Sequence, residues 1–86
     1  SFLDEMLRTD RKLRLEEVDL PPNFKSRTFG SLEPRTPEYV LLAVRAGKHW
    51  HFNPSSDFQL EPGHVVIAMA TPYGRHELEL AMRSET

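Results

Sequence analysis

The chain has 86 residues, of which 38% are hydrophobic and 28% charged, with a formal net charge of −2 and no cysteine. This length fits one domain, and the lack of cysteine excludes disulfides and thiolate zinc sites. The longest apolar runs, 39–44 and 65–70, have six residues each, far fewer than the ~20 that cross a bilayer, so direct membrane insertion is not expected.

The chain begins with a short amphipathic segment. Phe2, Leu3, Met6 and Leu7 recur at helical spacing, which predicts about two turns of helix. A helix this short is unstable alone in water. We therefore interpret residues 1–11 as a helix tail or linker from a preceding domain, and 12–86 as the domain itself.

Residues 12–20 alternate apolar and polar side chains, which predicts a strand. The doublet Glu16–Glu17 shifts the alternation by one residue, so we expect a bulge there or two short strands. The pair Pro21–Pro22 has no N–H donors and ends the strand.

An irregular segment with glycine and prolines follows. Within it, residues 28–32 are expected to form one helical turn that places Phe29 and Leu32 in the core. Asn23 or Ser26 is the expected N-cap.

Two segments around Gly47 predict a β-hairpin. Residues 38–45 are a continuous apolar run, typical of a strand covered on both faces. Residues 49–53 alternate strictly, so Trp50 and Phe52 share one face, where we expect core packing. His49, His51 and Asn53 lie on the other face.

The last third predicts a turn, a strand and a helix. Pro62–Gly63 suits a tight turn, and 65–70 is a second buried strand. Thr71 is the expected N-cap of a helix whose first residue is Pro72, with its core face made of Leu78, Ala81 and Met82. The predicted fold class is α+β: a small, mostly antiparallel sheet of about four strands, a short helical turn and a C-terminal helix.

Two histidines offer the most suggestive spacing for chemistry. His49 and His51 lie two apart on a predicted strand, so both rings point the same way and suit a transition metal. A third ligand would come from one of four residues: Asp57, Glu61, His64 or His76. Such pairs arise often by chance, and a polar pair facing solvent or an interface is the favoured interpretation.

Enzyme activity is not expected. No serine lies in a nucleophile elbow, and four glycines are too dispersed for a phosphate-binding loop. The acid pairs Glu16–Glu17 and Glu77/Glu79 diverge on a strand and on a helix, so neither makes a catalytic dyad.

Residues 21–50 carry five basic and two acidic residues, a net of +3, too little for nucleic-acid binding. Their cations are either solvated surface charges or a set that converges on one small anion: Lys25, Arg27, Arg35, Arg45 and Lys48. Arg45 and Lys48, with His49, are expected at the hairpin corner, where a corner doubled by a two-fold axis grips an anion.

Several blocks together resemble the C-terminal domain of the regulator-of-potassium-conductance family, also called the TrkA C-terminal domain. The resemblance covers 12–82, and its strongest element is a strand with Arg-x-Gly at 45–47, followed by Leu-x-x-Gly at 60–63 and a closing strand. Its other blocks are 17–21, 28–32, 39–44, Asn53–Pro54 and Thr71–Pro72. The family usually has Asp where this chain has His64, a position we interpret as stabilising the turn.

The resemblance implies a cytoplasmic regulatory domain of a potassium channel or potassium transport protein. Such domains follow a Rossmann-like domain, pair as homodimers and act on a transmembrane pore or transporter subunit. Some bind a small effector, a cyclic dinucleotide or an ion, at the dimer interface; no other cofactor is implied. The first residues expected at such a ligand are Arg45, Lys48, His49 and His51. Two alternatives stay open, a metal-binding module using His49 and His51, and a purely structural dimerisation domain.

Overall fold

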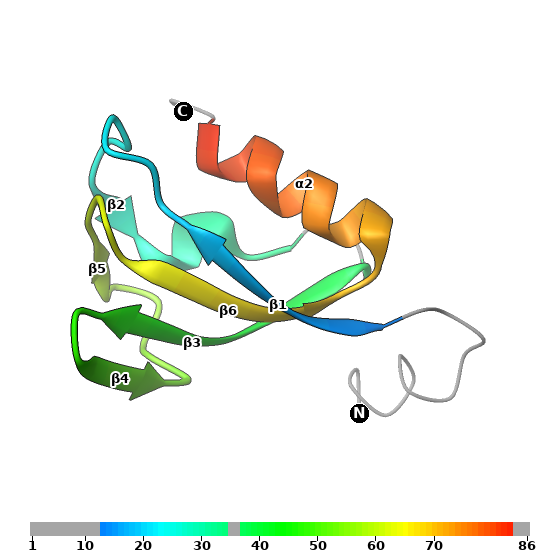
Figure 1. The fold of residues 1–86 in the computed structure, drawn as a ribbon, viewed down its shortest axis with the longest axis horizontal. Helices are drawn as coiled ribbons and strands as arrows, with labels where there is room; N and C mark the ends of the chain where they lie inside the picture. The colour runs from blue at the N-terminus through cyan, green and yellow to red at the C-terminus, as the bar shows by residue number, and fades with distance from the viewer. Residues whose placement is uncertain (1–12, 35–36, 84–86) are drawn as a thin grey trace.

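The computed structural model describes residues 13–34 and 37–83. The fold is α+β, as predicted: a four-stranded antiparallel sheet with one long helix on one face (Figure 1). The elements in order are β1 (Arg14–Asp19), β2 (Arg27–Thr28), the 3-10 helix η1 (Phe29–Leu32), β3 (Tyr39–Ala46), β4 (His49–Phe52), β5 (Gln59–Leu60), β6 (Val65–Ala70) and α2 (Pro72–Arg83). The predicted helix tail or linker at 1–11 lies outside the described residues.

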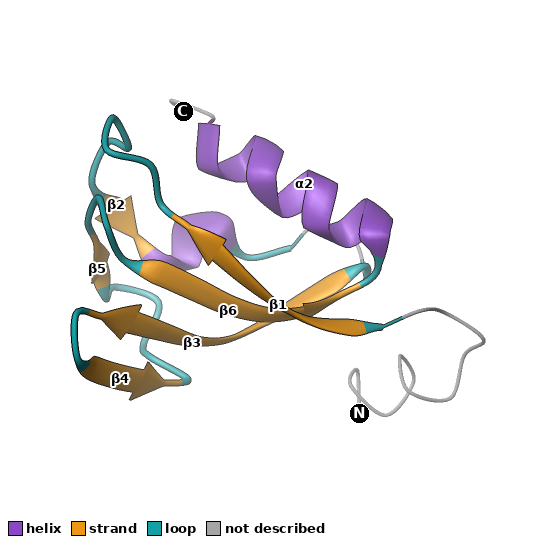
Figure 2. Ribbon diagram, viewed as in Figure 1, coloured by secondary structure: helices purple, strands orange, loops and turns teal. Residues whose placement is uncertain are grey.

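The sheet has the order β1-β6-β3-β4, and every neighbouring pair is antiparallel (Figure 2). The two apolar segments 39–44 and 65–70 are neighbours in this sheet, because β3 pairs with β6 along most of its length. The sequence did not predict β2 and β5, which pair over two residues as a separate small sheet.

The bulge predicted in the first strand is wrong. β1 runs in one unbroken register against β6, from Arg14 opposite Ala70 to Asp19 opposite Val65. Each carboxylate of the doublet finds its own partner, because Glu16 bonds Arg75 of α2 and Glu17 bonds Arg45 on the opposite face. The register shift lies in β3 instead, between Leu41 and Ala43.

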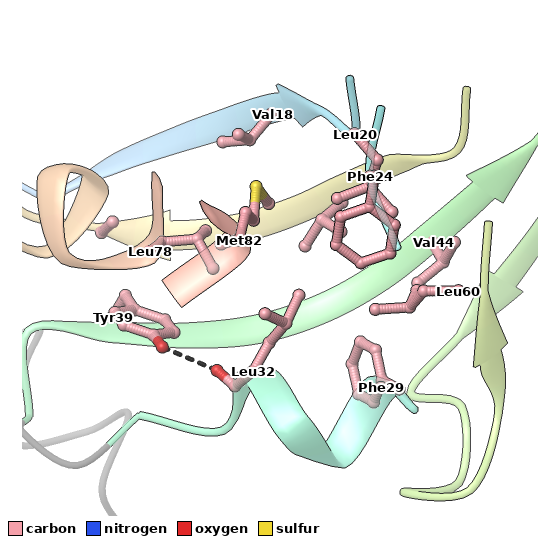
Figure 3. Close-up of a cluster of buried hydrophobic side chains, with 13 residues drawn as sticks. Val18, Leu20, Phe24, Phe29, Leu32, Tyr39, Val44, Leu60, Leu78 and Met82 are labelled. Carbon is pink, nitrogen blue, oxygen red and sulfur yellow. Dashed lines mark hydrogen bonds between the residues drawn. The ribbon is translucent and has the colours of Figure 1, made fainter. Parts of the chain in front are cut away.

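The main core lies between the sheet, α2 and η1 (Figure 3). Its buried members are Val18, Leu20, Phe24, Phe29, Leu32, Tyr39, Val44, Leu60, Val66, Ala68, Ala70, Leu78 and Met82. The prediction that η1 places Phe29 and Leu32 in the core is confirmed. Its N-cap, however, is Thr28 with no side-chain capping bond, and Ser26 instead donates a hydrogen bond to Glu61.

The helix α2 begins as the sequence predicts. The Gly74 N–H donates to the Thr71 hydroxyl over 2.9 Å, so Thr71 caps the first turn. Leu78 and Met82 are buried, and Ala81 packs against the same cluster. No helix in the described ranges is both long and apolar enough to span a membrane.

The sheet face away from α2 is called here the outer face. Its buried cluster contains only residues of β3 and β6: Ala43, Val65 and Ile67. No other element of the described chain joins it. In the run 38–45, Val44 on the inner face and Ala43 on the outer face are both buried, although no second helix or strand of the described residues packs on the outer face.

Candidate functional site

The outer face carries exposed aromatic side chains along the β3–β4 hairpin. In the register, Trp50 lies opposite Arg45 and Phe52 opposite Ala43. Trp50 is 45% exposed and Phe52 is 75% exposed, so the prediction that this pair packs in the core is wrong. Alternation correctly placed the two rings on one face, but α2 and η1 pack against the other face.

Arg45 connects the aromatic pair to β1. Its guanidinium carbon lies 5.3 Å from the centroid of the Trp50 ring, and its Nη1 lies 3.3 Å from Oε1 of Glu17. The Trp50 and Phe52 rings are stacked, with centroids 5.8 Å apart and an interplanar angle of 10°. Glu17, Arg45, Trp50 and Phe52 therefore form a row across the outer face, above the small apolar cluster of β3 and β6.

The Arg45–Glu17 pair can exchange partners at low cost. The side chains of Arg45 and Glu17 are 34% and 59% exposed, and such surface pairs contribute about 0–1 kcal/mol. Contact with the Trp50 ring orients the guanidinium by a cation–π interaction. An anionic ligand that also presents a flat ring can thus replace Glu17 on Arg45 and stack on the exposed indole.

The other three predicted ligand residues lie elsewhere on the hairpin. Lys48 lies in the turn with Gly47, whose φ of +63° is a conformation that favours glycine. His49 and His51 share the face opposite Arg45, and the His51 ring lies 4.8 Å from that of Phe58. The sheet thus separates Arg45 from both histidines within one copy of the chain.

Among the described members of the wider cation set, Arg27 and Arg45 have different partners on different elements. Arg27 contacts the Phe24 ring at 5.3 Å and donates to the Ala81 carbonyl of α2, far in sequence and on another element from Arg45. Lys25 is exposed, and Arg35 lies outside the described residues.

The prediction that His49 and His51 share one face agrees with the register. Among the described residues, no group of three or more His, Cys, Asp or Glu could hold a metal ion. The Phe58 ring contacts both His51 and His64, with centroids 4.8 and 6.3 Å away. His64 stabilises its own turn, because its Nδ1 accepts a hydrogen bond from the Glu61 N–H at 3.2 Å and its N–H donates to the Glu61 carbonyl.

Sequence reasoning missed a cavity of about 440 Å³ at the start of β3. Its walls come from η1 and the two residues after it, from β3 and from the loop after β4: Phe29, Glu33, Pro34, Val40, Leu41, Asn53, Pro54 and Ser56. The loop is held close to η1, since the Gly30 N–H donates to the Ser56 carbonyl over 2.8 Å. Because three segments that are separate in sequence form this cavity, no local sequence pattern predicts it.

Comparison with known proteins found no family model and no curated protein that matches this chain.

Proposed function

We propose that this chain is a cytoplasmic regulatory domain that senses a small ligand as a homodimer and controls a potassium channel or potassium transport protein. The sequence blocks at 17–21, 28–32, 39–47 and 60–68 support this proposal, and so does the α+β fold. The observation that carries it is Arg45, held between Glu17 and Trp50 on the outer face of the sheet. A preceding Rossmann-like domain and a transmembrane pore or transporter subunit are the proposed partners.

The ligand that fits this row best has both a phosphate and a flat base, as a cyclic dinucleotide has. The phosphate would bond Arg45 in a charge-assisted fork, and a base would stack on Trp50. Lys48 extends the positive charge toward the hairpin turn. A ligand that prefers one arrangement of two copies shifts the population toward it, and a coupling of about 1–3 kcal/mol suffices to regulate a gate.

The test is a titration with cyclic dinucleotides and mononucleotides, followed by calorimetry and by tryptophan fluorescence. Trp50 is the one tryptophan in the chain, so its emission reports directly on the proposed site. We expect saturable binding that weakens at least ~10-fold, about 1.4 kcal/mol, in an Arg45→Ala, Lys48→Ala double variant.

The matched control is Arg83→Ala, which removes an exposed arginine from the last turn of α2. It should leave both affinity and fluorescence change as in the unmodified chain. Unchanged binding in the double variant would remove the proposed site, and no response to any of these anions would contradict the sensor function.

A purely structural dimerisation domain is the second candidate, and the exposure of Trp50 and Phe52 favours it. Large exposed apolar side chains side by side are typical of contact surfaces. This candidate predicts a dimer in solution whose melting temperature does not respond to any nucleotide tested.

A further inference from the structure

The two edges of the four-stranded sheet differ in how they are protected. β1 forms one edge, and its sequence Arg-Leu-Glu-Glu-Val-Asp places charged side chains on both faces. β4 forms the other edge, and its sequence His-Trp-His-Phe contains no proline, lysine, arginine or carboxylate. Charges and prolines on an edge strand oppose pairing with another chain. The side chains of β1 therefore oppose pairing with another chain, whereas those of β4 do not.

Within the described residues, β4 pairs with β3 along one side only, which leaves backbone groups at its centre without a strand partner there. The Asn53 N–H donates to the Leu42 carbonyl over 2.8 Å, so it points toward β3. Backbone groups alternate in direction along an antiparallel strand, which means that those of His51 also point toward β3. The N–H and C=O groups of Trp50 and Phe52 then point away from β3, along the open edge.

We propose that β4 pairs with β4 of a second copy of this chain, antiparallel and centred on His51. The sequence Trp50–His51–Phe52 has an aromatic residue on each side of its centre. A two-fold axis at His51 therefore places Trp50 opposite Phe52 of the second copy, and Phe52 opposite Trp50 of the second copy. These pairs exchange the outward backbone hydrogen bonds, while the two His51 residues face each other as a pair without hydrogen bonds.

The self-complementary sequence is the reason for choosing a second copy as the partner. In this register each exposed aromatic ring meets another aromatic ring across the strands, an arrangement that stabilises antiparallel pairs. No like charges oppose each other along β4, because the strand carries no carboxylate, lysine or arginine. The joined sheets share one outer face, on which the Arg45 residues of both copies flank the four rings.

This inference rests on the homodimer of the proposed function and adds which edge forms it. The first test uses the absence of cysteine from the chain. A His51→Cys variant should form a disulfide-linked dimer under mild oxidation, because Cα atoms in such pairs are about 4.5 Å apart, within disulfide range. Two control variants, Glu17→Cys on the β1 edge and Ser31→Cys on η1, should cross-link at least ~10-fold more slowly at equal concentration.

The second test compares Phe52→Pro with Phe52→Ala. Both remove an exposed ring, but proline also removes the outward N–H that the β3 ladder does not use. Light scattering should show a dissociation constant at least ~10-fold higher for Phe52→Pro than for Phe52→Ala. Circular dichroism checks the fold of each variant, and the cysteine series decides the question if Phe52→Pro does not fold.

The outcomes separate the two proposals. A dimer in which the His51→Cys variant cross-links no faster than Glu17→Cys or Ser31→Cys overturns the β4 edge and leaves the dimeric sensor standing. A chain that stays monomeric at every concentration overturns both. Fast and selective cross-linking of the His51→Cys variant without any nucleotide response supports pairing through β4 and contradicts the proposed nucleotide ligand.

Discussion

Tyr39 brings a hydroxyl group into the main core and uses it to connect two elements. Its side chain is buried, and the hydroxyl donates to the Leu32 carbonyl over 2.6 Å (Figure 3). This bond fastens β3 to the end of η1. Burial raises the pKa of the Tyr39 hydroxyl, and the negative charge of Glu77 raises it further.

The raised pKa predicts a loss of stability in alkali. The folded pKa of Tyr39 lies above the unfolded value of about 10, so its contribution is complete below pH ~10 and falls as pH rises through the folded value. Tyr39→Phe should cost about 1–2 kcal/mol at pH 8, and this difference should shrink in more alkaline buffer. Urea unfolding of the unmodified chain and of Tyr39→Phe from pH 8 to 11 measures this difference in unfolding free energy. A difference that stays constant over this pH range would contradict the role of the Tyr39 pKa.

Arg75 of α2 bonds two carboxylates, one on β1 and one on its own helix. Its guanidinium bonds Glu16 of β1 and, over 3.3 Å, Glu79 one turn along the helix. The hydrogen bond with Glu16 is the main cause that raises the pKa of Arg75. Because Glu16 is largely buried under this contact, the pair fixes the position of β1 beneath α2.

At the scale of elements, the entry into α2 depends on a close backbone approach. The Thr71 N–H donates to the Glu38 carbonyl over 3.0 Å, which fixes the start of the helix against the start of β3. A Cβ atom on Gly74 would lie 1.9 Å from that same carbonyl oxygen. Only glycine fits at this position, although glycine lowers helix propensity.

We expect Gly74→Ala to destabilise the fold although alanine is the better helix former by about 1 kcal/mol. The clash must displace α2 from β3, so the free energy of unfolding should fall by about 2 kcal/mol or more. His76→Ala, at an exposed position of the same helix, is the control and should change stability by less than ~0.5 kcal/mol. Denaturant titration of the two variants decides, and an unimpaired Gly74→Ala would mean that the helix shifts freely.

At the scale of the whole molecule, the helices of the described residues pack on one face of the sheet and leave the other with a small buried cluster. α2 and η1 cover one face with the main core, whereas the outer face presents Leu15, Trp50 and Phe52 as exposed apolar side chains. A small chain buries only ~60–65% of the surface that its unfolded form exposes. A second copy is a direct way to bury more.

Self-association should make thermal stability depend on concentration. Because a partner that binds only the folded state stabilises it by mass action, the melting temperature should rise by several degrees over a ~100-fold concentration range. A Trp50→Ser, Phe52→Ser double variant should lose this dependence, while Leu80→Ser, an exposed apolar position on α2, should keep it. A melting temperature that does not change with concentration in the unmodified chain would contradict the dimer.

The sequence by itself determined the elements whose signals are local. Alternation over 49–53 placed Trp50 and His51 on opposite faces, and Thr71–Pro72 marked the start of α2. Continuous apolar runs identified β3 and β6 as strands. These features depend on residues within one or two turns or one strand, so their physical causes are contained in a short stretch of chain.

Tertiary structure alone decided which faces are covered and which charges meet. The exposure of Trp50, the unbroken register of β1 and the contact of Arg45 with Glu17 all depend on residues distant in sequence. So does the cavity beside η1. Periodicity tells which side chains share a face, but burial depends on what packs against that face, and here α2 took the side opposite the aromatic pair.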